Sequence, residues 1–159
     1  MSATAQTGYF FMPEHIILVG ASERPHSLGE RIFSHLLGSS YQGKITPVNL
    51  RHSSVAGIPS YSSLSKIPGQ ADLVVAVIPP DHYDSLFKAC RKKDLRHIIL
   101  IQDWENLPPE SCKNARSIIQ KYHGDELNIT VCNSAGIQLP SLNLNIGTQT
   151  DYPAGHIAL

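Results

Sequence analysis

Short apolar runs alternate with stretches of helical periodicity along most of the chain. The apolar runs predict strands at 16–19, 44–49, 73–78, 97–101 and 127–131. Between them, apolar residues recur three and four positions apart, which predicts amphipathic helices. These helices are expected to begin at Leu28, after Asp81 as N-cap, and at the Pro108-Pro109 pair. Strands that alternate with such helices are typical of parallel βαβ units.

The character of individual runs sharpens this prediction. The run at 73–78 has no polar alternation, the pattern of a strand buried on both faces. Pro47 lacks an amide N–H, so the strand that contains it is expected to be interrupted or to lie near a sheet edge. We therefore predict a Rossmann-like, doubly wound α/β fold, with a mainly parallel sheet of about five or more strands and helices on both faces.

The predicted domain occupies residues 1–132. Residues 133–159 are rich in Gly, Pro, Asn and Thr, and we expect an irregular tail that leads into a following domain absent from this sequence. The last five residues, 155–159, are similar to the start of another strand. Following domains of the same native chain are therefore expected partners.

Composition narrows the classes of partner. Charged residues are only 16% of the chain, against about 25% in an average soluble domain, as a covered parallel sheet requires. Thirteen basic residues balance thirteen acidic ones, which argues against nucleic acid and anionic membranes as partners. No apolar run approaches a membrane span, and three widely spaced cysteines with scattered histidines predict neither disulfides nor a metal site. A cytoplasmic protein is expected.

The stretch from Val19 to Gly29 carries the most chemical information. It joins the first predicted strand to the first helix, at the sheet edge where doubly wound folds bind ligands and where a helix N-terminus attracts phosphate. Gly20 allows a tight turn, Ser22 and Ser27 offer hydroxyls, and Gly29 allows the helix to pack closely. The alternative is a plain connection whose glycine serves only the turn.

A dinucleotide fingerprint is incomplete in this stretch. Ser22 replaces the second glycine of GxGxxG, and the segment 49–52 after the second strand holds no acidic residue for a ribose. Both features weaken NAD binding, although Arg51 and His52 suit a phosphorylated ribose. An NAD(P)-binding redox or sensor domain remains the alternative function, and a structural remnant without ligand is a third hypothesis.

A set of short motifs occurs in a recognisable order. The set comprises Val19-Gly20-Ala21-Ser22 with Pro25 and Gly29, Gly43-Lys44-Ile45-x-Pro47-Val48-Asn49, Val55-x-Gly57-x-Pro59-x-Tyr61-x-Ser63-Leu64, the segment 72–79, and Asn133-Ser134-x-Gly136. From about Met12 to Leu159 the chain thereby resembles the CoA-binding domain of NDP-forming acyl-CoA synthetases. The resemblance implies a Rossmann-like domain that binds CoA or acyl-CoA.

The same resemblance implies where the ligand is held. Loops after the first three strands would cradle CoA, and Asn133 would lie near its thioester end. The implied cofactor-binding residues are Gly20, Ala21, Ser22, Arg24, Pro25, Ser27, Asn49, Arg51, Val77, Ile78, Pro79 and Asn133. No catalytic residue is implied, since the family's phosphorylated histidine and nucleotide site belong to later domains. The isolated chain is expected to bind CoA without catalysing a reaction.

Two segments depart from the family pattern. Val131-Cys132 stands where Gly-Pro usually precedes the asparagine, and 102–105 replaces a Ser/Thr-Ala/Gly-Gly-Phe turn. Both departures fall where the acyl end of CoA is expected. The parent protein is either an ADP-forming acyl-CoA synthetase or a bacterial protein lysine acetyltransferase with a synthetase-like region, and the degenerate turns favour the second.

Overall fold

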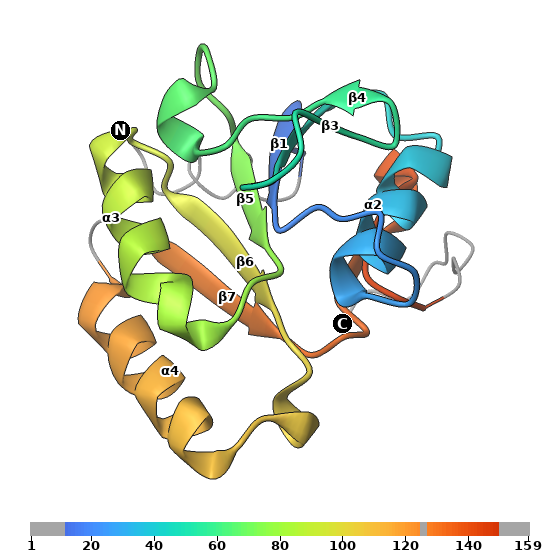
Figure 1. Cartoon of the computed structure of the whole chain (residues 1–159). Coiled ribbons are helices and arrows are strands. Elements are labelled where there is room, and N and C mark those ends of the chain that lie inside the picture. The colour runs from blue at the N-terminus through green and yellow to red at the C-terminus, as the bar shows by residue number, and fades with distance from the viewer. Residues whose placement is uncertain (1–11, 125–126, 150–159) are drawn as a thin grey trace.

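The computed structural model describes residues 12–124 and 127–149. Its centre is a five-stranded parallel sheet in the order β2-β1-β5-β6-β7, as Figure 1 shows. This arrangement confirms the predicted doubly wound α/β fold. The strands of this sheet are β1 (His15–Val19), β2 (Lys44–Val48), β5 (Leu73–Ala76), β6 (His97–Ile101) and β7 (Asn128–Cys132).

The position of each strand follows from its sequence. All residues of β5 and β6 are buried, as expected for central strands that helices cover on both faces. Pro47 lies in β2, which is an edge strand as predicted. The carbonyl of Pro47 accepts the N–H of Tyr61 at 3.1 Å, so a later segment runs along the outer edge of β2.

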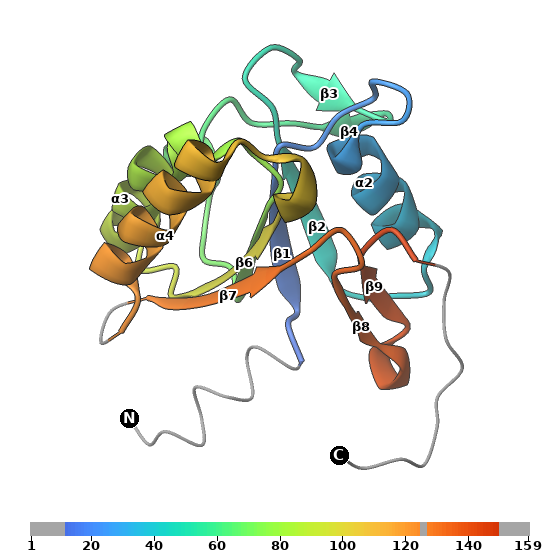
Figure 2. The ribbon, with the colours of Figure 1, turned by 90° about the horizontal axis from the view of Figure 1, so that it is seen from below.

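Helices cover the two faces of the sheet separately (Figure 2). α2 (Leu28–Gly38) buries Ile32, Phe33 and Leu36 against one face. α3 (Tyr83–Lys92) and α4 (Pro109–Tyr122) share the core on the other face. No helix in the described ranges, 12–124 and 127–149, is long and apolar enough to cross a membrane.

The start of α3 differs from the prediction. Asp81 is not the N-cap, because it lies inside a 3-10 turn, η2 (Pro80–His82), and His82 occupies the cap position without a side-chain hydrogen bond. The physical reason is Pro80, whose fixed φ starts the helical backbone one turn earlier. The other two helices begin where the sequence predicts, at Leu28 and Pro109.

The segment that connects β2 to β5 contains no α-helix. It forms a small antiparallel hairpin, β3 (Ser54–Val55) with β4 (Ile58–Pro59), and then a 3-10 turn, η1 (Leu64–Lys66). A similar 3-10 turn, η3 (Trp104–Asn106), follows β6. The helical backbone of the β2–β5 connection is therefore limited to the 3-10 turn at Leu64–Lys66.

The tail after β7 is more ordered than the sequence analysis expects. β8 (Ile137–Leu139) and β9 (Leu144–Ile146) form an antiparallel hairpin around η4 (Pro140–Leu142). Its strands are only three residues long, so alternation is too short to detect, but Leu144 and Ile146 are buried in the α2 core. The expectation of an irregular tail is thus wrong for 137–146, while the strand expected at 155–159 lies outside the described residues.

Candidate functional site

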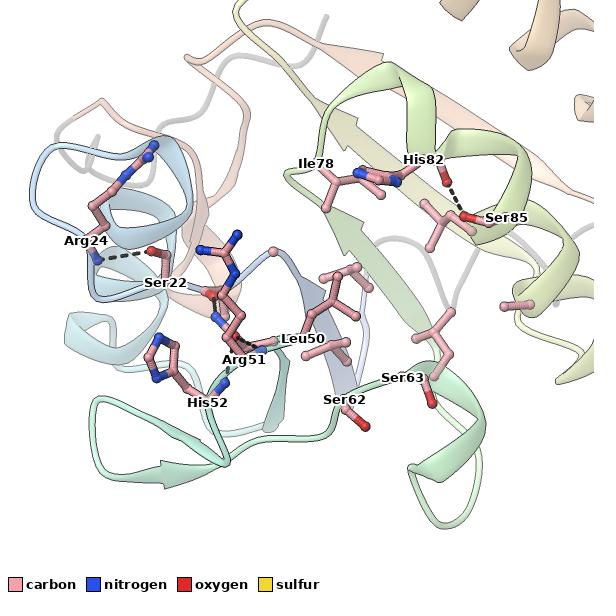
Figure 3. Close-up of a pocket in the computed structure, with 18 of the residues that line it drawn as sticks. Ser22, Arg24, Leu50, Arg51, His52, Ser62, Ser63, Ile78, His82 and Ser85 are labelled. Atoms are coloured by element: carbon pink, nitrogen blue, oxygen red, sulfur yellow. Dashed lines mark hydrogen bonds between the residues drawn. The ribbon is translucent and has the colours of Figure 1, made fainter.

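A cavity of about 790 Å³ opens at the carboxyl ends of β1, β2 and β5. The order of strands reverses at β1, whose neighbours are β2 and β5, and doubly wound folds bind ligands at such a reversal. In Figure 3, Ser22, Arg24, Arg51 and His52 gather on one side, and Ile78, His82 and Ser85 lie across from them. The lining is Val19, Gly20, Ala21, Ser22, Glu23, Arg24, Val48, Asn49, Leu50, Arg51, His52, Ser62, Ser63, Leu64, Ile78, His82, Ser85, Leu86 and Ala89.

Two glycines shape the loop between β1 and α2. Gly20 has φ +92°, and a Cβ there would lie 2.2 Å from the carbonyl oxygen of Val77. A Cβ on Gly29, in the first turn of α2, would lie 2.1 Å from the carbonyl oxygen of Gly20. Real Cβ atoms do not approach backbone so closely, so both positions require glycine. The predicted tight turn and the predicted close packing of the helix are both present.

The same loop presents hydrogen-bond donors to the cavity. Ser27 caps α2, because its Oγ accepts the N–H of Glu30 at 3.2 Å. Within 12–124 and 127–149, the backbone N–H groups of Ala21, Ser22 and Glu23 donate to no protein group. Free N–H groups beside a helix N-terminus form a site for an anion.

Side chains of the loop add to the free N–H groups of 21–23, and we call this set of donors the cradle. Ser22 Oγ accepts the N–H of Arg24 at 3.0 Å, which leaves the Ser22 hydroxyl proton available to a ligand. The side chains of Arg24 and Arg51 contribute positive charge at the mouth of the cavity (Figure 3).

Asn49 joins the two loops on the basic side. Its Nδ2 donates to the carbonyl of Ala21 at 2.8 Å, and its Oδ1 accepts the N–H groups of Arg51 at 2.8 Å and His52 at 3.0 Å. The Oδ1 lone pairs are therefore already used within the protein. Asn49 acts as a bracket that fixes the backbone around the cavity.

The opposite wall of the cavity is largely apolar. Ile78 after β5, Leu86 and Ala89 of α3, and Leu64 of η1 supply it. Leu50 stands at the mouth with 80% of its surface exposed, unusually high for a leucine beside a cavity. Ser85 also lines this wall, and its hydroxyl donates to the carbonyl of His82 at 2.8 Å. An anion cradle and an apolar wall thus share one space.

The structure gathers about half of the predicted cofactor-binding residues at the cavity. Those that line it are Gly20, Ala21, Ser22, Arg24, Asn49, Arg51 and Ile78. Those that do not are Pro25, Ser27, Val77, Pro79 and Asn133.

The five residues outside the lining have other places. Ser27 serves as the cap of α2, and Val77 packs against the core on the α2 side. Pro25 is exposed in the loop before α2, and Pro79 is exposed just before η2. Asn133 follows β7, where its Oδ1 accepts the N–H of Ala135 at 3.0 Å.

Several lining residues are absent from the predicted set. Ser63 and Leu64 belong to a motif quoted for the resemblance, so that motif was a usable signal. Ser85, Leu86 and Ala89 lie on the face of α3 that turns toward the cavity. No local pattern marks this face, because it depends on how α3 crosses the sheet.

The other end of the carboxyl edge, after β6 and β7, is closed by internal hydrogen bonds. The carbonyl of Cys132 accepts Trp104 Nε1 at 2.8 Å and the N–H of Gln102 at 3.3 Å.

Burial raises the pKa of the Cys132 thiol, and burial raises the pKa of Cys90 to about 12. Both shifts favour the unreactive thiol. Among the described residues, no group of His, Cys, Asp or Glu is arranged to hold a metal ion.

Comparisons with known proteins agree with this geometry. The family model of the CoA binding domain matches residues 14–139. The alpha subunit of an ADP-forming acetate–CoA ligase from Pyrococcus furiosus is 31% identical over 152 residues, which cover 94% of this chain and 33% of that subunit. The chain therefore spans about a third of the length of this relative.

Solved structures show the same fold. The crystal structure of a Pyrococcus horikoshii protein superposes with a TM-score of 0.74 at 27% identity, over 94% of this chain and 34% of that one. An acetyl-coenzyme A synthetase from Candidatus Korarchaeum cryptofilum, solved with phosphate and ADP, gives a TM-score of 0.71 at 22% identity, over 90% and 31% of the two chains. Together with the match over 14–139, these findings place the chain in the CoA-binding domain family.

Proposed function

We propose that this chain binds CoA or an acyl-CoA in the cavity at the ends of β1, β2 and β5. The observation that carries the proposal is the union of a phosphate-type cradle and an apolar wall in one cavity of about 790 Å³. CoA combines an anionic pyrophosphate with an adenine ring and a long pantetheine arm. A volume of this size is within the roughly 300–1,000 Å³ typical of cofactor sites.

Each side of the cavity receives a part of the ligand. The free N–H groups of 21–23 and the hydroxyl of Ser22 hold the pyrophosphate. Arg24 and Arg51 neutralise phosphate charge at the mouth. Ile78 and Leu86 contact the adenine side, and Leu50 loses its exposed surface to the ligand.

Not every predicted residue touches the ligand in this proposal. Gly20 and Asn49 shape the cradle, and Ser27 supports it by capping α2. Pro25, Val77 and Pro79 lie outside the lining, so no contact with the ligand is proposed for them. Asn133 remains the candidate for the thioester end, because the end of β7 lies on the same edge of the sheet.

The parent protein is proposed to be an ADP-forming acyl-CoA synthetase. The relative from Pyrococcus furiosus carries this activity in its name, and this chain matches a third of its length. That likeness favours a synthetase over the lysine acetyltransferase that the sequence analysis preferred. In a synthetase other domains supply acyl activation, and in an acetyltransferase a separate domain supplies the site for transfer to lysine. In both cases the present chain is proposed to bind its ligand without turnover.

A thermal melt with competing ligands tests the proposal. Saturation with CoA at a hundredfold excess over its dissociation constant is expected to stabilise the fold by about 2.7 kcal/mol. NADPH at equal concentration serves as the matched competitor, since the alternative is an NAD(P) domain. An unchanged melting point at millimolar CoA supports a remnant without ligand, and tighter binding of NADPH supports the redox alternative.

An activity assay completes the test. The chain is incubated with acetate, ATP and CoA, and thioester formation is followed. No turnover is expected. Thioester formed by these 159 residues alone contradicts a pure binding module.

A further inference from the structure

We infer that Glu23 is a positioning residue that ties the β3–β4 hairpin to the cradle and thereby sets ligand affinity. The inference rests on the proposed function. It begins from an electrostatic mismatch: Glu23 lines a cavity whose other charged side chains, Arg24 and Arg51, suit an anion. A carboxylate there repels a phosphate, so its presence in the lining calls for a different role.

The hydrogen bond of Glu23 indicates that task. Its Oε1 accepts the backbone N–H of Ala56, 33 positions further along the chain. Ala56 lies in the turn between β3 and β4, so the bond joins the loop after β1 to the tip of the hairpin. Figure 2 shows the hairpin beside the loop that leads from β1 into α2.

The exposed N–H of Ala56 has no acceptor within the hairpin itself. Ala56 and Gly57 both have positive φ, +49° and +75°, as in the two-residue type I′ turn. In such a hairpin the first turn residue directs its N–H away from the paired strands, so no hairpin carbonyl accepts it. Ala56 also carries the strain of a left-handed conformation without being glycine. The charge-assisted bond that Ala56 donates to Glu23 gives this strained turn an acceptor within the protein.

The hairpin is too small to hold its own position. Each strand has two residues, and isolated hairpins are marginal even when longer. Val55 packs into the same core as Ala21. Glu23, two residues after Ala21, adds a hydrogen bond to Ala56, the residue after Val55. An apolar and a polar interaction therefore fix the hairpin to the cradle.

The tether matters for the ligand because of what the hairpin connects. Residues 49–52 immediately precede it and 62–64 closely follow it, and both segments line the cavity. A released hairpin lets both walls move. Asn49 holds the first segment through its own hydrogen bonds. Among the described residues, Glu23 makes the only side-chain hydrogen bond between the loop after β1 and the tip of the hairpin.

The test compares two variants that remove the same charge. Glu23→Gln keeps an oxygen that accepts the Ala56 N–H, and Glu23→Ala does not. Calorimetric titration with CoA is expected to give about tenfold weaker binding for Glu23→Ala. Glu23→Gln is expected to bind as tightly as the parent or more tightly. Glu110→Ala, on the exposed surface of α4, controls for the loss of one negative charge.

The outcomes separate a tether from a simple charge. Equal affinities for the alanine and glutamine variants, whether unchanged or both tighter, overturn the inference. A melting point of Glu23→Ala close to that of the parent shows that weaker binding is not global unfolding. If Glu23→Ala unfolds, Glu23→Asp, which keeps the charge but shortens the reach, takes its place and is expected to bind CoA more weakly than the parent, which carries the same charge.

Hydrogen exchange distinguishes this inference from the proposed function. The Ala56 amide is expected to exchange faster in Glu23→Ala than in the parent and Glu23→Gln, with no ligand present. Unchanged exchange overturns the tether even if CoA binds. If the parent binds no CoA, the proposed function fails, and the exchange rates still decide the tether. By reciprocity, CoA should slow Ala56 exchange in the parent.

Discussion

The two ends of the sheet's carboxyl edge differ in how their backbone groups are satisfied. After β1, the N–H groups of 21–23 have no partner within the described residues, and these three residues line a cavity. After β6 and β7, the carbonyl of Cys132 accepts two hydrogen bonds, one of them from Trp104. One end, the open end, combines unused donors with a cavity, and the other, the closed end, ties the segments after β6 and β7 together through the Cys132 carbonyl.

This difference indicates that the fold provides an edge, while the loops after each strand determine which end of it has the features of a ligand site. Parallel strands end at both places, and both are followed by short polar segments. Only the first combines a left-handed glycine, a capped helix N-terminus and an apolar wall. The closed end also holds both departures from the family pattern, at 102–105 and at Val131-Cys132. The departures therefore leave the cradle untouched.

The largest effect is expected from a substitution in the loop after β1, at the open end of the sheet edge. Gly20→Ala places a Cβ 2.2 Å from the carbonyl oxygen of Val77 at a φ of +92°. We expect a loss of about 2–4 kcal/mol in the free energy of unfolding and loss of CoA binding. Chemical denaturation and calorimetry measure the two effects.

Gly38→Ala is the matched control for that substitution. A Cβ at Gly38, the last residue of α2, meets nothing within 4 Å. This variant should be as stable as the parent or up to about 1 kcal/mol more stable. Equal effects of the two substitutions contradict a special role for the turn at Gly20.

A charge placed in the cradle tests the anion site directly. Ser22→Asp puts a carboxylate beside the N–H groups of 21–23, where it repels the pyrophosphate and takes up their hydrogen bonds. We expect CoA affinity to fall by more than about a hundredfold, or 2.7 kcal/mol, with an unchanged fold by circular dichroism. Ser117→Asp, on the exposed part of α4, should bind normally. Undiminished binding by Ser22→Asp would mean that the pyrophosphate binds elsewhere.

The bracket at Asn49 is expected to have a smaller effect. Asn49→Ala removes one donor to Ala21 and the acceptor of two backbone N–H groups. We expect roughly tenfold weaker CoA binding and a loss of about 1–3 kcal/mol of stability. Asn49→Asp keeps the acceptor but turns a carboxylate oxygen toward the Ala21 carbonyl, so it too should be less stable than the parent. Parent-like affinity in Asn49→Ala argues against the bracket.

The smallest effect concerns the closed end. Because burial raises the pKa of the Cys132 thiol, less thiolate forms at pH 8, and alkylation should be slower than for free cysteine. Raising the pH should accelerate the reaction. Saturating CoA should leave the rate within about twofold if the ligand stays at the open end. Strong protection by CoA instead extends the site to β7 and supports Asn133 at the thioester end. Mass spectrometry of the modified chain gives the rate at each cysteine.

The elements that the sequence predicts well are those with a local cause. The apolar run at 73–78, the proline in β2 and the spacing of Gly20 from Gly29 each act within one segment, and the structure contains the strand, the edge and the close approach. The Asp81 cap failed for an equally local reason, because the adjacent Pro80 started the turn first.

The parts that the sequence could not predict depend on distant segments. Glu23 meets Ala56 only because the hairpin folds back over the loop, and Leu86 reaches the cavity only because of the path of α3. The hairpin at 137–146 is stabilised mainly by burying Leu144 and Ile146 against α2, more than a hundred residues away in sequence. No periodicity within such a short segment reports that contact.

The close approach of Gly29 to Gly20 also affects ligand kinetics. Because helix and loop are in backbone contact, the cradle cannot deform unless α2 moves, and α2 is held by Arg31 and His35, which bond to the carbonyls of Thr148 and Gly147. A site held in this way is already in its binding shape. CoA should therefore associate in a single phase whose rate rises linearly with concentration, without a slow closing step.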